Sequence, residues 1–314
     1  MFIVNAAGFI DTRTHSALGC GHEWPLCNGS LIPAKWGLHT IIEFAHRGLV
    51  AVVSILFLVI AIWAWWKYGK WIEVKIAILL GAAFIIIESI LGALGVLFAD
   101  PPPVLASHFG VALIAFDAVT MLVIVIRQIR RKQLELVSEG KVDTYRNKRV
   151  PVLFGLRGEL PVKSIRRLVI FTTVYVYLAM YVGAYVSATD AGAYFRGWPF
   201  PTETYSQAHV YYLIDLLHRS IALGLVILSI WLVAVTKRIR NQRNDLYRGS
   251  VLLLILVIAQ AFSGAYLIFS HLSTSAFVIH VSIISVLFST LGYLVVQVSP
   301  DSKKARSLAM EQVS

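Results

Sequence analysis

Four histidines have the residue type and the spacing to do chemistry in this 314-residue chain: His46, His108, His218 and His280. His218 follows His46 by 172 positions, and His280 follows His108 by the same interval. Each lies four to seven residues inside a long apolar segment, or roughly 6–10 Å below one membrane surface at the helical rise per residue. Ionisable residues inside a bilayer are costly and usually functional. A single buried histidine more often just donates a hydrogen bond to a backbone carbonyl. Four imidazoles at one depth, in a repeated pattern, instead indicate that they bind a metal or a cofactor.

The ligand of these imidazoles is either a bare metal ion or a heme. Neutral imidazole suits zinc, copper and iron, but a closed zinc site needs four ligands and the apolar segments contain no thiolate. Heme iron needs one or two axial imidazoles and a flat apolar slot between helices. Two imidazoles in each half of the chain therefore favour two hemes. Arg47 and Arg219 each follow a histidine directly, and they either pair with heme propionates or extend to the membrane surface.

Carboxylates accompany the histidines. Glu43 precedes His46 by three residues, so both side chains project from one helix face, where Glu43 can transfer a proton or stabilise a cationic intermediate. Asp215, at the matching place, can do the same or cap a helix. Glu88 is interpreted as an interhelical hydrogen-bonding group. No role is assigned to Asp117, which faces away from His108, or to five histidines in loops or at segment edges: His15, His22, His39, His209 and His271.

The two cysteines, Cys20 and Cys27, lie in a segment rich in glycine and proline, Gly19-Cys20-Gly21-His22-Glu23-Trp24-Pro25-Leu26-Cys27-Asn28-Gly29. An outward-facing pair lies in an oxidising compartment and favours a structural or redox-active disulfide. A zinc site that uses His22 is the alternative, but two cysteines and one histidine are an incomplete ligand set.

The elements that must position these residues are membrane helices. Hydrophobic residues make up 58% of the chain, charged residues 14%, and the mean hydropathy is +0.73, which excludes an ordinary soluble protein and a disordered one. Apolar runs long enough to cross a bilayer occur at 41–66, 74–98, 104–126, 168–187, 211–236, 250–270 and 275–297. The apolar stretch 1–10 is only half a span, and it does not resemble a signal peptide.

The basic residues predict the orientation. Of the 28 Lys and Arg residues, 23 lie in the segment after the first span, in 127–167, in 237–248 and in the C-terminal tail. Cytoplasmic loops are enriched in Lys and Arg, so we expect a multi-pass protein of the cell (plasma) membrane with a cytoplasmic C-terminus and an outer Cys20–Cys27 loop. The same distribution assigns the net charge of +11 to one membrane face and argues against nucleic acid as a partner.

An internal repeat predicts the architecture. Glu43-Phe44-Ala45-His46-Arg47 matches Asp215-Leu216-Leu217-His218-Arg219, and Glu88-Ser89-Ile90-Leu91-Gly92-Ala93 matches Gln260-Ala261-Phe262-Ser263-Gly264-Ala265, both at 172. We therefore expect an all-α integral membrane protein of two pseudo-repeated four-helix bundles in parallel orientation, whose first helix is truncated at the start of the chain. The predicted domains are 1–130 with a substrate-heme site, a basic cytoplasmic linker at 131–164, and 165–314 with a heme b site.

The cysteine segment, Glu43-Phe44-Ala45-His46-Arg47 and His108-Phe109-Gly110 resemble the bacterial heme A synthase family, as do Gly183-Ala184-Tyr185-Val186, His218-Arg219, Ser263-Gly264 and His280. The resemblance covers nearly the whole chain. It implies an eight-helix protein that oxidises the C8 methyl of heme O to a formyl group, giving heme A for terminal oxidases. It also implies a heme b at His218 and His280, the substrate or product heme at His46 and His108, a part in the chemistry for Glu43, and Cys20 and Cys27 as the outer cysteine pair.

This chain departs from the family pattern in its short first helix, in the length of 127–167 and in the absence of a cysteine pair from the second half. The main alternative is a non-catalytic diheme b-type electron carrier, which the four histidines alone support equally well. A heme-transfer factor is a third reading. Glu43 and the cysteine segment favour the enzyme, because a carrier needs neither. Expected partners are heme O and membrane lipid, with heme O synthase and a second copy of the chain as further candidates.

Overall fold

The computed structural model describes residues 1–99, 101–138 and 163–299 of the chain. Within those residues every regular element is a helix, and no strand is present. The long helices are α1 (Phe2–Arg13), α2 (Leu38–Tyr68), α3 (Ile72–Phe98), α4 (Pro102–Ser138), α6 (Lys163–Ala188), α8 (Val210–Lys237), α9 (Asn244–Phe269) and α10 (Thr274–Val298). Two single turns, η1 (Ala191–Tyr194) and α7 (Tyr205–Ala208), lie in the loop between α6 and α8.

Seven of these helices are long and apolar enough to cross a membrane: α2, α3, residues Pro103–Arg131 of α4, α6, α8, α9 and α10. They correspond to the seven apolar runs of the sequence, which confirms a multi-pass membrane protein. α1 has 12 residues, which rise about 18 Å as a helix and are too few for a complete span.

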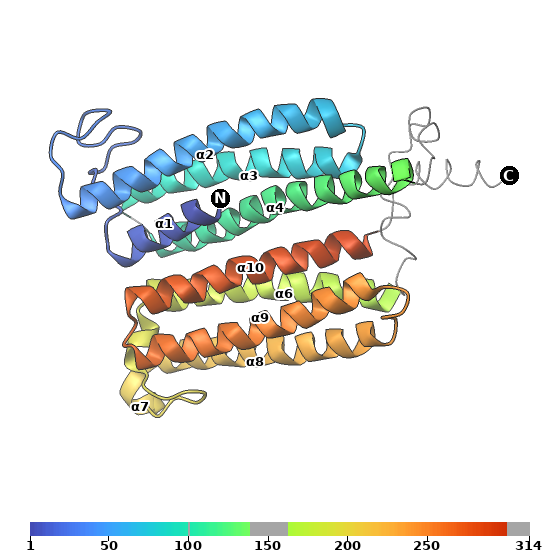
Figure 1. The fold of residues 1–314 in the computed structure, drawn as a ribbon. Helices are drawn as coiled ribbons and strands as arrows, with labels where there is room; N and C mark the ends of the chain where they lie inside the picture. The colour runs from blue at the N-terminus through green and yellow to red at the C-terminus, as the bar shows by residue number, and fades with distance from the viewer. Residues whose placement is uncertain (100, 139–162, 300–314) are drawn as a thin grey trace.

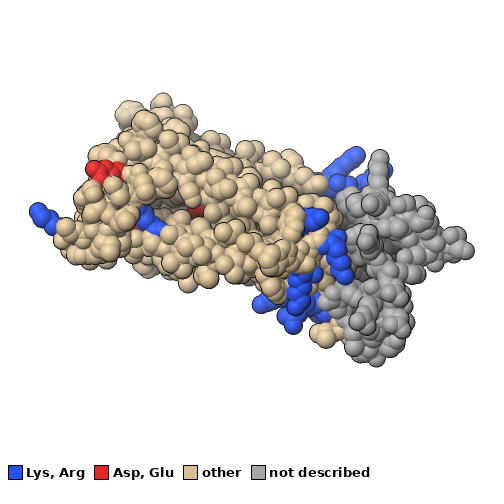
Figure 2. All heavy atoms as spheres, turned by 90° about the horizontal axis from the view of Figure 1, so that it is seen from above, with Lys and Arg blue, Asp and Glu red and all other residues tan. Residues whose placement is uncertain are grey.

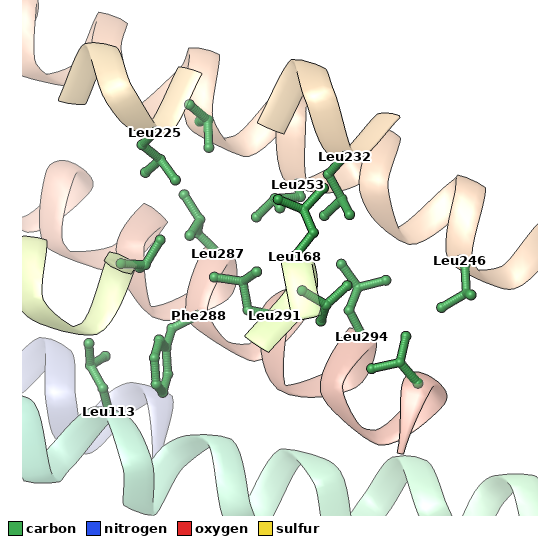
Figure 3. Packing of buried hydrophobic residues seen from close by; sticks show 14 residues of the cluster. Leu113, Leu168, Leu225, Leu232, Leu246, Leu253, Leu287, Phe288, Leu291 and Leu294 are labelled. Atoms are coloured by element: carbon green, nitrogen blue, oxygen red, sulfur yellow. The ribbon is translucent and has the colours of Figure 1, made fainter. Parts of the chain in front are cut away.

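The helices lie in two layers (Figure 1). α1 to α4 lie together, and α6, α8, α9 and α10 lie beside them. One cluster of buried apolar side chains joins α2, α3 and α4, around residues such as Phe57, Ala64 and Leu122. A second cluster fills the space between α6, α8, α9 and α10, and Leu113 of α4 belongs to it (Figure 3).

The two layers meet where α4 packs against α6 and α10, and where α1 packs against α10. Leu113 of α4 is directed toward Phe288 of α10 in Figure 3. At one end of the molecule, Arg13 Nη2 donates a hydrogen bond of 2.6 Å to the carbonyl oxygen of Leu272, in the turn between α9 and α10. The last residue of α1 is thereby tied to the second layer.

The predicted basic linker at 131–164 largely falls outside the described residues. α4 continues as far as Ser138, α6 begins at Lys163, and 139–162 are not described. Lys and Arg side chains gather at this end of the molecule in Figure 2. The histidines, the cysteines and Glu43 lie toward the opposite end of the helices.

Candidate functional site

The first histidine pair, His46 of α2 and His108 of α4, comes together in the layer formed by α1 to α4. The two imidazoles are close enough to interact electrostatically. Each residue is half-buried, and each has a buried Nδ1 atom with no hydrogen-bond partner in the chain. Buried polar atoms normally have partners, so two neighbouring rings without them indicate a ligand.

Glycines of the neighbouring helices lie against these rings. A Cβ atom at Gly8 of α1 would be 3.0 Å from His46 Cε1, and one at Gly92 of α3 would be 3.4 Å from His108 Cε1. A side chain at Gly8 would therefore press on the His46 ring, whereas one at Gly92 would only touch the His108 ring. Glycine keeps the space beside each ring open, as a flat group lying between helices requires.

The second histidine pair, His218 of α8 and His280 of α10, is built in the same way. The two rings are neighbours. A Cβ atom at Gly183 of α6 would be 3.3 Å from His218 Cε1, and one at Gly264 of α9 would be 3.6 Å from His280 Cε1. His218 Nδ1 is buried and has no partner. The packing of these glycines against the rings was not predicted from the sequence, although Gly92 and Gly264 are in the matched repeat segments.

Hydrogen bonds orient His280. Ser263 Oγ donates to the Gln260 carbonyl at 2.8 Å, so the contact of 2.8 Å between Ser263 Oγ and His280 Nδ1 is donated by the ring. Nε2 then carries the lone pair, and it lies 3.0 Å from the side-chain nitrogen of Gln260. The bond through Nδ1 thus fixes the tautomer that an axial iron ligand requires, while the Gln260 amide, which donates to Nε2 here, would have to turn away for iron to bind.

The first pair lacks this support. Leu91 stands 172 positions before Ser263 and has no hydroxyl, which explains why His108 Nδ1 has no partner. Glu88 stands where the second half has Gln260, and it lines a small hollow together with Met1 and Val4 of α1. The two pairs therefore share a plan but differ in the groups around the rings.

Glu43 is one of the most buried side chains of the protein, with 1% of its surface exposed. Oε2 accepts a hydrogen bond of 2.6 Å from the backbone N–H of Cys20, and Oε1 accepts one from Arg47 Nη2. The carboxylate thus connects the helix that carries His46 to the cysteine loop. A buried charge needs such partners.

The outer loop is closed by a disulfide between Cys20 and Cys27, as the sequence predicted. Arg47 Nη1 donates to the carbonyl oxygens of Glu23 at 3.1 Å and Leu26 at 2.8 Å, both inside the loop. Thr40 Oγ1 donates to the carbonyl of Gly19 at 2.8 Å. The loop is therefore fixed over α2 by side chains within two turns of His46.

Arg219 repeats this arrangement in the second half. Its Nε donates to Asp215 Oδ2 at 2.5 Å, and its Nη1 donates to the carbonyls of Gly197 and Pro199, both at 2.9 Å. Nη2 is buried and has no partner. Both arginines therefore hold a loop, and Arg219 retains a donor that a carboxylate ligand can use.

The remaining residues considered from the sequence do not join the histidine pairs. The five other histidines are exposed. Asp117 lies between the layers, where its carboxylate is packed against Gly292 of α10. Across the described residues, no three His, Cys, Asp or Glu side chains form a group that could hold a metal ion. The residues present instead fit a planar group ligated by two imidazoles.

The chain is similar to known proteins over most of its length. A family model for a cytochrome oxidase assembly protein, COX15-CtaA, matches residues 1–292. A heme A synthase from Lysinibacillus sphaericus is 33% identical over 306 residues, which cover 95% of this chain and 92% of that protein. Heme A synthases from Bacillus licheniformis and Geobacillus kaustophilus are 32% and 31% identical, over 95% and 94% of this chain and 92% and 86% of their own lengths.

Proposed function

Since the chain belongs to the COX15-CtaA family of cytochrome oxidase assembly proteins, we propose that it is a heme A synthase. In this proposal it oxidises the C8 methyl of heme O to a formyl group and so gives heme A for terminal oxidases. The relatives named above support this reaction. The family is one of oxidoreductases that act on heme.

The observation that carries the proposal is the difference between the two histidine pairs. Beside the first pair, the buried Glu43 is bonded to a disulfide-closed loop. Beside the second pair, Asp215 and Arg219 hold a loop without cysteines. An electron carrier needs neither a disulfide-closed loop nor a carboxylate bonded to that loop. Both sites have a buried carboxylate, Glu43 or Asp215, but only at the first is it bonded to a disulfide-closed loop, and this difference favours a reaction there.

We assign the substrate to His46 and His108 and a heme b to His218 and His280. The hydrogen bond from His280 Nδ1 to Ser263 orients this ring and supports a permanent cofactor in the second half. The free Nη2 of Arg219 supports a contact with a heme propionate there. Arg47 is assigned the corresponding contact in the first half, in addition to its bonds to the loop.

The chain's own residues supply position, charge and exclusion of water. When bound, the heme of the second half supplies a redox centre for the electrons that the methyl group loses. Glu43 holds a negative charge one helical turn from His46, where it can take up a proton released from the substrate. The cysteine loop covers that end of α2, and Arg47 keeps it there.

We further propose two pseudo-repeated four-helix bundles, with domains at 1–130 and 165–314. The matched glycine–histidine contacts and the matched arginine contacts support this repeat. The gathering of Lys and Arg in Figure 2 supports a cytoplasmic C-terminus, with the cysteine loop outside the cell membrane. Heme O synthase and a second copy of the chain are proposed partners.

The proposal is tested by heme extraction from membranes that make heme O, with and without this protein, followed by reversed-phase chromatography. We expect heme A, or its hydroxymethyl precursor, only when the protein is present. Unchanged heme O together with heme B on the purified protein would contradict the proposal and favour a diheme electron carrier.

A further inference from the structure

Asn5 of α1 is a buried amide without a partner. Only 5% of its surface is exposed, and neither its side-chain nitrogen nor its side-chain oxygen has a hydrogen-bond partner in the chain. Burying an amide without hydrogen bonds costs free energy. Both polar atoms of the Asn5 side chain are unpaired, so a ligand that accepts a hydrogen bond from the nitrogen and donates one to the oxygen would offset this cost.

The neighbours of Asn5 on α1 show where the side chain points. Gly8, one turn later, faces the ring of His46 on α2. Phe2 and Phe9 face α4, where their rings lie 6.1 Å from Phe116 and 5.3 Å from Phe109, centroid to centroid. At about 100° per residue, Asn5 lies between these two directions. It therefore points into the first bundle, between the helices that carry the first histidine pair.

Asn5 also lies deeper in the membrane than His46. α1 runs from Met1 to Arg13, and Arg13 is bonded to the turn between α9 and α10 at the end where the cysteine loop lies. Asn5 precedes Gly8 by three residues, which is about 4.5 Å farther from that end. Arg47 follows His46 directly on α2, and its guanidinium extends the other way, toward the outer loop, where it donates to the carbonyls of Glu23 and Leu26.

The second half has no amide at the matching place. Met180 precedes Gly183 by three residues, as Asn5 precedes Gly8, and it packs against the apolar cluster of the second layer. The polar side chain thus belongs to the pair assigned to the substrate and is missing from the pair assigned to heme b.

We propose that Asn5 selects heme O by a hydrogen bond to the hydroxyl of its hydroxyethylfarnesyl arm. This inference rests on the proposed function. The hydroxyl distinguishes heme O from heme B, and it lies on the porphyrin edge opposite the charged propionates. With the propionates toward the outer surface, where charge is least costly, that edge faces the middle of the membrane, where Asn5 lies. An amide matches a hydroxyl as donor and as acceptor.

The test is heme titration of the full-length protein whose second site already holds heme b, followed by absorbance. Wild type, Asn5→Leu and Met180→Leu are each titrated with heme O and with heme B, and His46→Leu defines the signal without the first site. We expect Asn5→Leu to weaken heme O binding about five- to tenfold, the effect of one hydrogen bond, and to leave heme B binding unchanged. Met180→Leu should change neither.

Three results would overturn the inference: unchanged heme O binding by Asn5→Leu, equal weakening of both hemes, or raised thermal stability as the only effect. The last is expected if the amide is merely an unpaired group in the core. Heme extraction with the wild-type protein separates this failure from that of the proposed function. If the wild-type protein makes heme A and Asn5→Leu still prefers heme O over heme B as wild type does, only the role of Asn5 is rejected. If the wild-type protein neither makes heme A nor binds heme O, both proposals are rejected.

Discussion

The carboxylate of Glu43 accepts a hydrogen bond of 2.6 Å from the backbone N–H of Cys20, 23 positions earlier in the chain. Through this bond the helix that carries His46 is joined to the disulfide loop. A displacement of the loop therefore moves the partner of the Glu43 carboxylate, and a substitution of Glu43 removes a bond that holds the loop. Loss of activity on removal of Glu43 can therefore have a chemical or a structural cause, and the two must be separated by experiment.

Glu43→Gln and Glu43→Ala make that separation. The amide oxygen of glutamine can still accept from Cys20, so the loop stays in place, but the charge is lost. If the carboxylate handles a proton, Glu43→Gln should lower heme A formation by about 100-fold or more, measured by chromatography of extracted heme. A purely structural carboxylate would leave Glu43→Gln active and only Glu43→Ala inactive.

Replacing the histidines should separate the two heme sites. His218→Leu or His280→Leu should remove the permanent heme, so heme B falls from about one per chain to near zero in a pyridine hemochrome assay. His46→Leu should retain this heme and lose heme A formation. Loss of heme B in His46→Leu, with the protein still folded, would reverse the assignment of the two pairs.

Gly8→Ala should disturb the first site. Its Cβ would be 3.0 Å from His46 Cε1, so the ring must shift, and heme O binding should weaken about fivefold or more. Gly48→Ala is the matched control, because no atom lies within 4 Å of its Cβ. Gly264→Ala, with an ordinary contact of 3.6 Å to His280, should leave the second site intact. Equal effects of Gly8→Ala and Gly48→Ala would show that helix propensity, not the ring contact, is responsible.

Arg219→Lys should weaken retention of the heme in the second half. The planar guanidinium of Arg219 bonds Asp215 through Nε and the loop carbonyls through Nη1, and it still has Nη2 for a ligand. The single ammonium group of lysine cannot make all of these bonds. We expect the heme to dissociate about tenfold more readily, as for loss of one charge-assisted hydrogen bond, measured as heme transfer to an apoprotein acceptor. Lys35→Met, at an exposed position of the outer loop, is the control and should retain its heme.

Removing the disulfide should cost stability but keep the Glu43 contact. Cys20 and Cys27 are seven positions apart, and a loop of this size contributes about 2 kcal/mol. The double variant Cys20→Ala, Cys27→Ala retains the backbone N–H that Glu43 accepts. We expect a lower melting temperature in detergent with part of the heme A formation preserved. Complete loss of activity at unchanged stability would instead indicate redox chemistry at the cysteines.

Much of the site was predictable because local patterns encode it. A run of about 20 apolar residues must become a helix in lipid, since no water satisfies its backbone, so the seven spans followed from the sequence. The 172-residue interval paired His46 with His218 and His108 with His280. The three-residue spacing between Glu43 and His46 put both on one face.

The tertiary structure alone decided what those side chains touch. The sequence predicted that Glu43 lies beside a heme pocket, but not that its carboxylate is bonded to Cys20, nor that Arg47 holds the loop carbonyls. No sequence pattern indicates a role for Asn5, because a single amide in an apolar stretch has no periodic signal. Such contacts join residues distant along the chain, and they depend on how loops fold over helices and how helices rotate against each other. Hydropathy and spacing determine which segments cross the membrane, whereas packing determines which polar groups meet there.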